Sequence, residues 1–85
     1  MANSNQLNPI DQKVIDFTAV YTDRPPSSIN DSTTLESIGI IGEEDTIEFT
    51  MELEDSFGLT YEEGDADGMV TVGNETALIK KKLGG

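Results

Sequence analysis

The chain has 85 residues, and 17 acidic residues against five basic ones give it a formal net charge of −12 at pH 7. This length suits a single domain. Cysteine and histidine are both absent from the sequence, which excludes disulfides, zinc–thiolate sites, cysteine nucleophiles and imidazole catalysis. We therefore expect a protein that is not an enzyme.

The negative charge opposes binding to phosphate backbones and to anionic membranes, so we expect neither nucleic acid nor membrane as a partner. A basic protein partner, approached under electrostatic steering, suits the charge better. An acidic surface also serves solubility alone, and we expect a monomer. Residues 1–8 lack an apolar signal stretch, and no apolar run reaches the ~18 residues of a membrane span, which leads us to expect a cytoplasmic protein.

We expect residues 1–8 to form a frayed tail before a single domain of residues 9–83. Asn8-Pro9 is typical of a helix start, because Asn can cap and Pro fits the first turn. Four apolar residues then follow the spacing of one helix face: Ile10, Val14, Phe17 and Tyr21. Arg24-Pro25-Pro26 ends this first predicted helix, since the residue before proline avoids helical dihedrals.

Residues 25–42 are rich in Ser, Asn, Asp and Thr and predict a long loop. We expect its isolated aliphatic side chains to fix it to the core: Ile29, Leu35, Ile38, Ile40 and Ile41.

A second helix is predicted from Gly42-Glu43-Glu44-Asp45 to about Phe57, because acidic residues favour a helix N-terminus. Phe49, Leu53 and Phe57 form its buried stripe, and Ile47 and Met51 lie on another face, where at least one should be exposed. Residues 46–53 also alternate between polar and apolar, as a strand would. We favour the helix because the stripe continues beyond the alternation and Gly58 follows it.

The remaining segment predicts shorter elements. After a brief extended piece at Leu59 and Tyr61, we expect one helical turn over Asp65–Met69. A last helix from Asn74 to about Lys82 is capped by Thr71 or Asn74, and residues 84–85 form a tail. Three side chains are expected to pack inward from this helix and its approach: Val72, Ala77 and Leu78.

Several of these segments resemble the acyl carrier proteins. Residues 45–49, Asp-Thr-Ile-Glu-Phe, are similar to the family's Asp-Thr-Val-Glu-Leu, and residues 51–57 are similar to Met-Ala-Leu-Glu-Glu-Glu-Phe. Looser matches occur at residues 65–66, 71–72 and 77–81. The resemblance covers about residues 9–83 and implies an all-α, irregular four-helix bundle with a long loop between helices one and two.

The family holds phosphopantetheine on the Ser of an Asp-Ser-Leu motif at the start of helix two. Counting back from Asp45 places that motif at Gly42, Glu43 and Glu44, so Glu43 occupies the position of the attachment serine. A carboxylate cannot replace the hydroxyl as nucleophile toward coenzyme A. The chain is similar in this respect to some carrier-like bacterial proteins that have Gly followed by acids there. The resemblance therefore implies a carrier-like module without a cofactor.

An alternative stays open, in which the attachment serine is displaced. Ser37, within Glu36-Ser37-Ile38, and Ser56 are the candidates, and the protein would then be a working acyl or aminoacyl carrier that holds phosphopantetheine.

In the family, helix two also docks partner enzymes. Carried over to this chain, its docking surface consists of Glu44, Ile47, Glu48, Met51, Glu54 and Asp55. The resemblance implies a basic partner such as a fatty-acid, polyketide or related biosynthetic enzyme. The competing interpretation is that these acidic residues only form a solvated helix face, and that Ile47 packs against a loop and does not meet a partner.

Two further motifs suggest other functions. Residues 63–68 resemble half of a calcium loop, with Asp65 and Asp67 as weak candidate ligands, but Asn74 stands where the bidentate Glu belongs, so we favour a capped acidic turn and no metal site. The terminal Leu83-Gly84-Gly85 resembles that of sulfur carriers and ubiquitin-like modifiers. That second alternative requires a β-grasp fold with a strand over residues 46–53.

Overall fold

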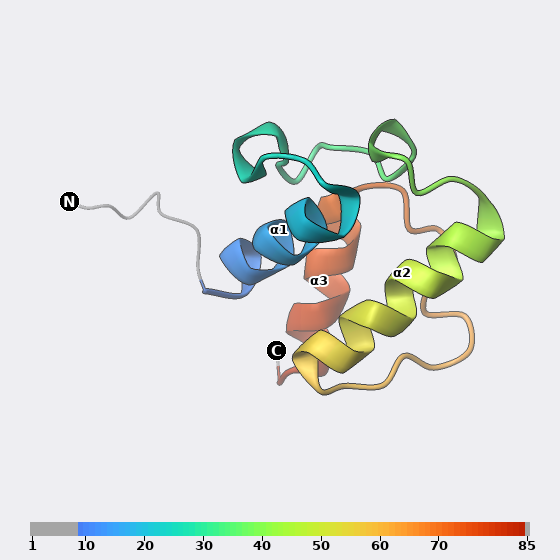
Figure 1. Cartoon of the computed structure of the whole chain (residues 1–85). Helices are drawn as coiled ribbons and strands as arrows, with labels where there is room; N and C mark the ends of the chain where they lie inside the picture. Colours follow the sequence, from blue (N-terminus) through green and yellow to red (C-terminus); the bar gives the residue numbers. More distant parts are fainter. Residues whose placement is uncertain (1–8, 85) are drawn as a thin grey trace.

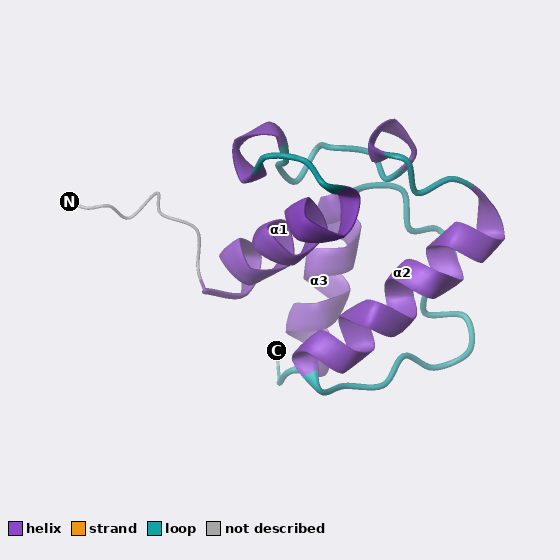
Figure 2. Cartoon of the chain, viewed as in Figure 1, coloured by secondary structure: helices purple, strands orange, loops and turns teal. Residues whose placement is uncertain are grey.

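The computed structural model describes residues 9–84. These residues form three α-helices, α1 (Pro9–Thr22), α2 (Gly42–Phe57) and α3 (Val72–Lys82), and two 3-10 helices, η1 (Pro26–Ser28) and η2 (Glu36–Ile38). The predicted all-α class is thereby confirmed for this range, in which an isolated bridge between Thr34 and Thr71 is the only β-type pairing (Figure 2). The tail expected at residues 1–8, with its capping Asn8, and Gly85 lie outside the described residues.

Helix α1 is the element on which the other two helices assemble. It contacts both α3 and α2, while residues 23–41 run along one side of the helices (Figure 1). Residues 58–71, which we call the connector, lead from the end of α2 to the start of α3 (Figure 1). The long loop predicted between the first two helices is present and contains η1 and η2.

Helix α2 begins and ends as its sequence predicts. Three acidic residues occupy its first turn, and the Asp45 carboxylate accepts a hydrogen bond of 3.1 Å from the Ile41 backbone N–H. Gly58 ends the helix in a left-handed conformation with φ of 66°. The strand alternative for residues 46–53 is therefore wrong, because the i, i+4 stripe outweighs the local alternation.

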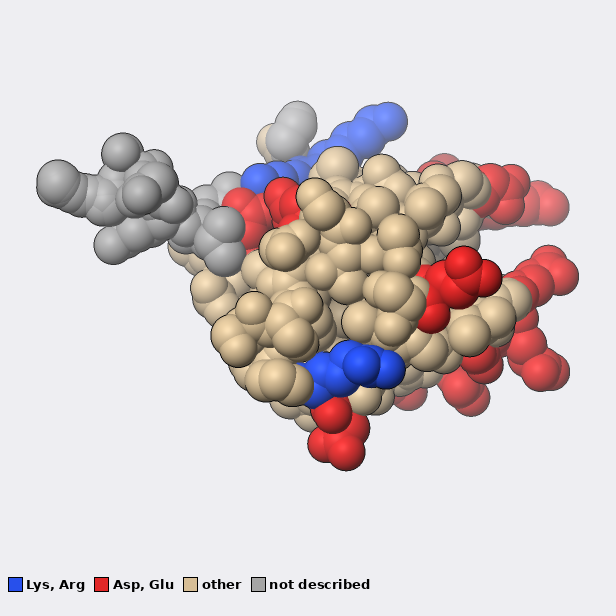
Figure 3. All heavy atoms as spheres, turned by 90° about the horizontal axis from the view of Figure 1, so that it is seen from above, with Lys and Arg blue, Asp and Glu red and all other residues tan. Residues whose placement is uncertain are grey.

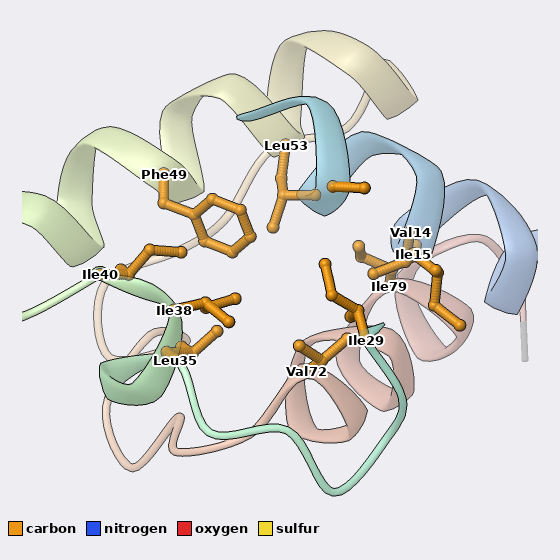
Figure 4. Packing of buried hydrophobic residues seen from close by; sticks show 11 residues of the cluster. Val14, Ile15, Ile29, Leu35, Ile38, Ile40, Phe49, Leu53, Val72 and Ile79 are labelled. Carbon is orange, nitrogen blue, oxygen red and sulfur yellow. The ribbon is translucent and has the colours of Figure 1, made fainter. Parts of the chain in front are cut away.

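The hydrophobic core lies between the three helices and the loop that precedes α2 (Figure 4). Phe49 and Leu53 of α2 are fully buried in it, and Phe57 is half-buried at its edge. The prediction that the loop is fixed by its aliphatic residues is confirmed for Ile29, Leu35, Ile38 and Ile40. It is wrong for Ile41, which is 56% exposed where the chain turns into α2.

The helical turn predicted over Asp65–Met69 is not formed. Residues 63–68 make successive turns, in which the Asp65 N–H donates to the Glu62 carbonyl and the Asp67 N–H donates to the Gly64 carbonyl. Gly64 and Gly68 have φ values of 91° and 77°, which a right-handed helix cannot include. The described residues consequently contain three α-helices and not the four that the sequence predicts.

Helix α3 starts at Val72, two residues earlier than predicted, with Thr71 as its cap. The Thr71 hydroxyl accepts from the Asn74 N–H at 3.1 Å, and the Asn74 side chain accepts from the Thr71 N–H at 2.9 Å. This register places Val72, Glu75, Thr76 and Ile79 on the buried face. The inward packing predicted for Ala77 is therefore wrong, since Ala77 is exposed, and Leu78 is only half-buried.

The start of α3 is tied to the loop before α2. The Val72 and Gly73 N–H groups donate to the carbonyls of Thr33 and Asp31 at 2.9 and 3.0 Å. A Cβ on Gly73 would lie 2.9 Å from the Asp31 carbonyl oxygen, so only glycine fits this approach. The Leu35 N–H donates to the Val70 carbonyl at 2.9 Å. These bonds hold η2 and the connector beside each other.

Candidate functional site

One face of α2 points away from the core and carries two apolar side chains among acids. The spacing of i, i+3, i+4 and i+7 places six residues on this face, which we call the α2 face: Glu44, Ile47, Glu48, Met51, Glu54 and Asp55. Ile47 is 49% and Met51 is 59% exposed. The prediction that at least one of the pair is exposed is confirmed, and it holds for both.

The acids of the α2 face differ in their surroundings. Glu44, Glu48 and Asp55 are exposed, whereas Glu54 is half-buried and its carboxylate accepts a hydrogen bond of 2.6 Å from the Tyr61 backbone N–H. Glu54 thus holds the connector against α2, a structural task that the sequence did not indicate. The carboxylates of Glu44, Glu48 and Asp55 make no such hydrogen bond within residues 9–84 and face solvent.

Glu43, at the position of the family's attachment serine, is exposed in the first turn of α2. It follows Gly42, whose φ of 86° lets the chain turn sharply from the loop into the helix. The candidate Ser37 lies in η2, where its hydroxyl donates to the Thr34 carbonyl at 2.7 Å, and Ser56 lies exposed in the last turn of α2. Neither of these two serines is at the start of α2.

A groove of about 760 Å³ opens between the beginning of α2, η2 and the connector. We call it the α2–connector groove. Its apolar lining consists of Leu35, Ile40, Ile47, Ala66, Met69 and Val70. Ile47 thereby belongs both to the α2 face and to this groove. The competing interpretation, in which Ile47 lies against a loop, is therefore correct for the part of Ile47 that faces the connector.

Charge is distributed unevenly over the molecule. The lining of the α2–connector groove includes Glu36, Glu43, Glu63 and Asp67 and no basic residue. Acidic side chains gather on the right side of the view in Figure 3, where α2 and the turns of the connector lie in Figure 1. Two lysines of α3 form ion pairs: Lys80 with Asp11 of α1 at 3.0 Å, and Lys82 with Asp65, in the connector turns beside the groove, at 2.6 Å. The four acids of the lining therefore make the electrostatic potential in the groove negative.

A buried carboxyl group lies on the inner face of α3. Glu75 is fully buried, and its Oε1 accepts a hydrogen bond of 2.8 Å from the Tyr61 hydroxyl, while its Oε2 has no protein partner within residues 9–84. Burial raises the pKa of Glu75, and the Tyr61 hydrogen bond opposes this increase. Burial and the nearby Glu75 also raise the pKa of Tyr61.

Sequence reasoning missed Glu75, because a charged residue is an improbable core residue. The available signal was the spacing of the apolar Val72 and Ile79 at i and i+7, which places Glu75, at i+3, on the same helix face.

The half-loop that resembles a calcium site is organised in another way. The Asp65 carboxylate accepts from the Glu62 N–H at 2.7 Å and pairs with Lys82, which lowers the pKa of Asp65. Asp67 is exposed at the groove. Within residues 9–84, no three carboxylates are grouped so that they could hold a metal ion.

Comparison with known proteins adds no relative: no family model and no curated protein matches the chain. In the described part of the chain, every helix is too short or too polar to cross a membrane.

Proposed function

We propose that this chain is a carrier-protein-like interaction module that has no prosthetic group and docks a basic partner protein through the α2 face. One observation carries this proposal: Ile47 and Met51 are exposed side by side on a helix whose surrounding positions are acidic. Exposed apolar side chains ringed by charge are typical of protein interfaces. The partner suited to this surface presents Lys or Arg around an apolar patch.

The resemblance to acyl carrier proteins narrows the class of partner. It suggests a fatty-acid, polyketide or related biosynthetic enzyme that recognises the α2 face without a bound acyl group. As part of the same proposal, the connector stands in the place of the family's third helix, and the domain is a variant of the irregular four-helix bundle. In this variant, the turns at residues 63–68 replace the third helix of the bundle.

Charge reversal on the α2 face tests the docking. Glu48→Lys combined with Asp55→Lys should abolish capture of the partner, because both carboxylates are exposed and neither accepts a hydrogen bond within residues 9–84 that the fold would lose. Glu54 is left unchanged because it holds Tyr61. The measurement is affinity capture with identification of bound proteins, followed by calorimetric titration of each purified candidate.

The matched control is Asp16→Lys combined with Asp31→Lys, which changes the net charge equally on exposed residues of α1 and of the loop before α2. If a candidate partner protein binds both double variants equally well, the α2 face is not its docking surface.

The absence of a prosthetic group is tested separately. We expect no mass increase when the protein is incubated with coenzyme A and a broad-specificity phosphopantetheinyl transferase, beside a genuine carrier that is modified in the same tube. A gain of one phosphopantetheine would favour the working-carrier alternative, and peptide mapping would then distinguish Ser37 from Ser56 as the attachment site.

A further inference from the structure

The volume, the apolar lining and the negative charge of the α2–connector groove together indicate which kind of ligand it could bind. Its volume of about 760 Å³ lies within the range of about 300–1,000 Å³ that binding sites occupy. The groove is contiguous with the α2 face through Ile47, but its second wall comes from the connector, which the docking proposal does not use.

The apolar part of the groove is accessible. Val70, on the connector, is 58% exposed, and Ile47, on α2, faces the same groove. Leu35 and Ile40 close the inner end, where they belong to the buried core. A side chain entering from outside would therefore exchange water for aliphatic contacts, which is favourable in proportion to the apolar area covered.

The charged part of the groove selects for cations. Glu36 and Glu43 lie on the side of η2 and α2, and Glu63 and Asp67 lie on the connector opposite them. All four are exposed, and the groove lining contains neither Lys nor Arg to neutralise them. A ligand with an apolar centre and basic groups on both sides complements this arrangement.

The backbone of the groove wall indicates the form of that ligand. The Val70 N–H donates to the Asn74 side chain at 2.9 Å, and the Val70 carbonyl accepts from the Leu35 N–H. This wall therefore offers side chains and not the free strand edge that an extended peptide needs. A helix satisfies its own backbone groups and binds grooves through side chains at i, i+3, i+4 and i+7.

We propose that the α2–connector groove binds a basic amphipathic helix of the partner, with aliphatic side chains against Ile47 and Val70 and Lys or Arg side chains beside Glu43, Glu63 and Asp67. This inference rests on the proposed docking function and deepens it, because it names the partner segment that is recognised and adds the connector to the interface.

The probe is a synthetic helical peptide of Lys and Leu, with Leu at i, i+3, i+4 and i+7, and the comparison peptide has the same composition with its Leu residues scattered around the helix. Fluorescence anisotropy measures binding of both to the full chain. We expect the amphipathic peptide to bind at least about tenfold more tightly than the scattered one, because only it presents one apolar stripe to the groove.

The groove variant combines Glu63→Gln, Asp67→Asn and Val70→Ser, all exposed connector residues and none of them on α2. Its matched control combines Glu52→Gln, Asp31→Asn and Val20→Ser, exposed residues outside the groove with the same changes of charge and size. We expect the groove variant to bind the amphipathic peptide about tenfold more weakly than the control.

Chemical shifts of the backbone amides give an independent readout. With the amphipathic peptide, we expect the largest changes in residues 36–47 and 63–70, which form the groove. Equal affinities of the groove variant and its control, equal binding of both peptides, or shifts confined to residues 51–57 would overturn the groove proposal. None of these results would contradict the proposal that the α2 face docks a partner, because that proposal is tested by the variants at Glu48 and Asp55.

Discussion

Glu75 is the residue whose environment departs most from the usual preference of its type. Its side chain is fully buried on α3, and the Tyr61 hydroxyl, 14 positions earlier in the chain, supplies the one hydrogen bond recorded for its carboxyl group. Ionisation would leave a charge in an apolar core with a single donor, which is unfavourable. Protonated Glu75 therefore suits the folded state better than the carboxylate does.

We predict that Glu75→Gln removes a pH dependence of stability. Because the pKa of Glu75 is higher in the folded state than its ordinary value of 4.5, its contribution to stability is complete below that value and is lost as the pH rises through the folded-state pKa. Gln is neutral at every pH. The free energy of unfolding of the variant should therefore exceed that of the wild type by about 1–3 kcal/mol at alkaline pH.

Urea unfolding at a series of pH values from about 4 to 9 measures the difference. Glu52→Gln, on the exposed part of α2, is the control and should change the pH dependence of stability much less than Glu75→Gln does. A Glu75→Gln curve that is also parallel to the wild type would contradict a buried, preferentially protonated Glu75.

At the scale of elements, the capping residues of α2 and α3 were more predictable than the short turns of the connector. The acidic first turn and Gly58 predict the bounds of α2, and Thr71 was one of two candidate caps for α3. Capping depends on residues within four positions of the helix end, so it can be predicted from the sequence. The helical turn predicted over Asp65–Met69 was wrong: Gly68, inside it, has a φ of 77°, which a right-handed helix cannot include.

We predict that Thr71→Ala destabilises the protein by about 1 kcal/mol, since the Thr71 hydroxyl accepts the Asn74 N–H and no other side chain supplies this cap. Thr60→Ala, at an exposed position of the connector, is the control and should stay within about 0.5 kcal/mol of the wild type. Urea midpoints at constant slope make the comparison, and equal midpoints for the two variants would show that the capping box contributes nothing.

At the scale of the whole molecule, the net charge of −12 opposes folding, because the acidic side chains repel one another in the compact state. Acidic side chains crowd the side of the molecule that holds α2 and the connector turns (Figure 3). Two lysines of α3 pair with single acids: Lys80 with Asp11 of α1 and Lys82 with Asp65 of the connector. Like charges repel over a Debye length of about 30 Å at 0.01 M salt but only about 8 Å at 0.15 M. Repulsion should therefore limit stability at low ionic strength.

We predict that sodium chloride between about 0.01 and 0.15 M raises the free energy of unfolding by about 1 kcal/mol, or the melting temperature by roughly 4–8 °C. Glu44→Gln combined with Glu52→Gln should reduce this salt dependence, because it removes two exposed charges from α2. Thermal melts followed by circular dichroism provide the test. A melting temperature that falls with salt would mean that the two lysine ion pairs outweigh the repulsion.

The sequence by itself determined the position of α2, its buried Phe49 and Leu53, and the exposure of at least one of Ile47 and Met51, because these follow from spacing along one helix. Only the tertiary structure decided the burial of Glu75, the hold of Glu54 on Tyr61 and the groove between α2 and the connector. These features join residues from separate segments of the chain. Their proximity depends on how the elements pack, which local periodicity does not encode.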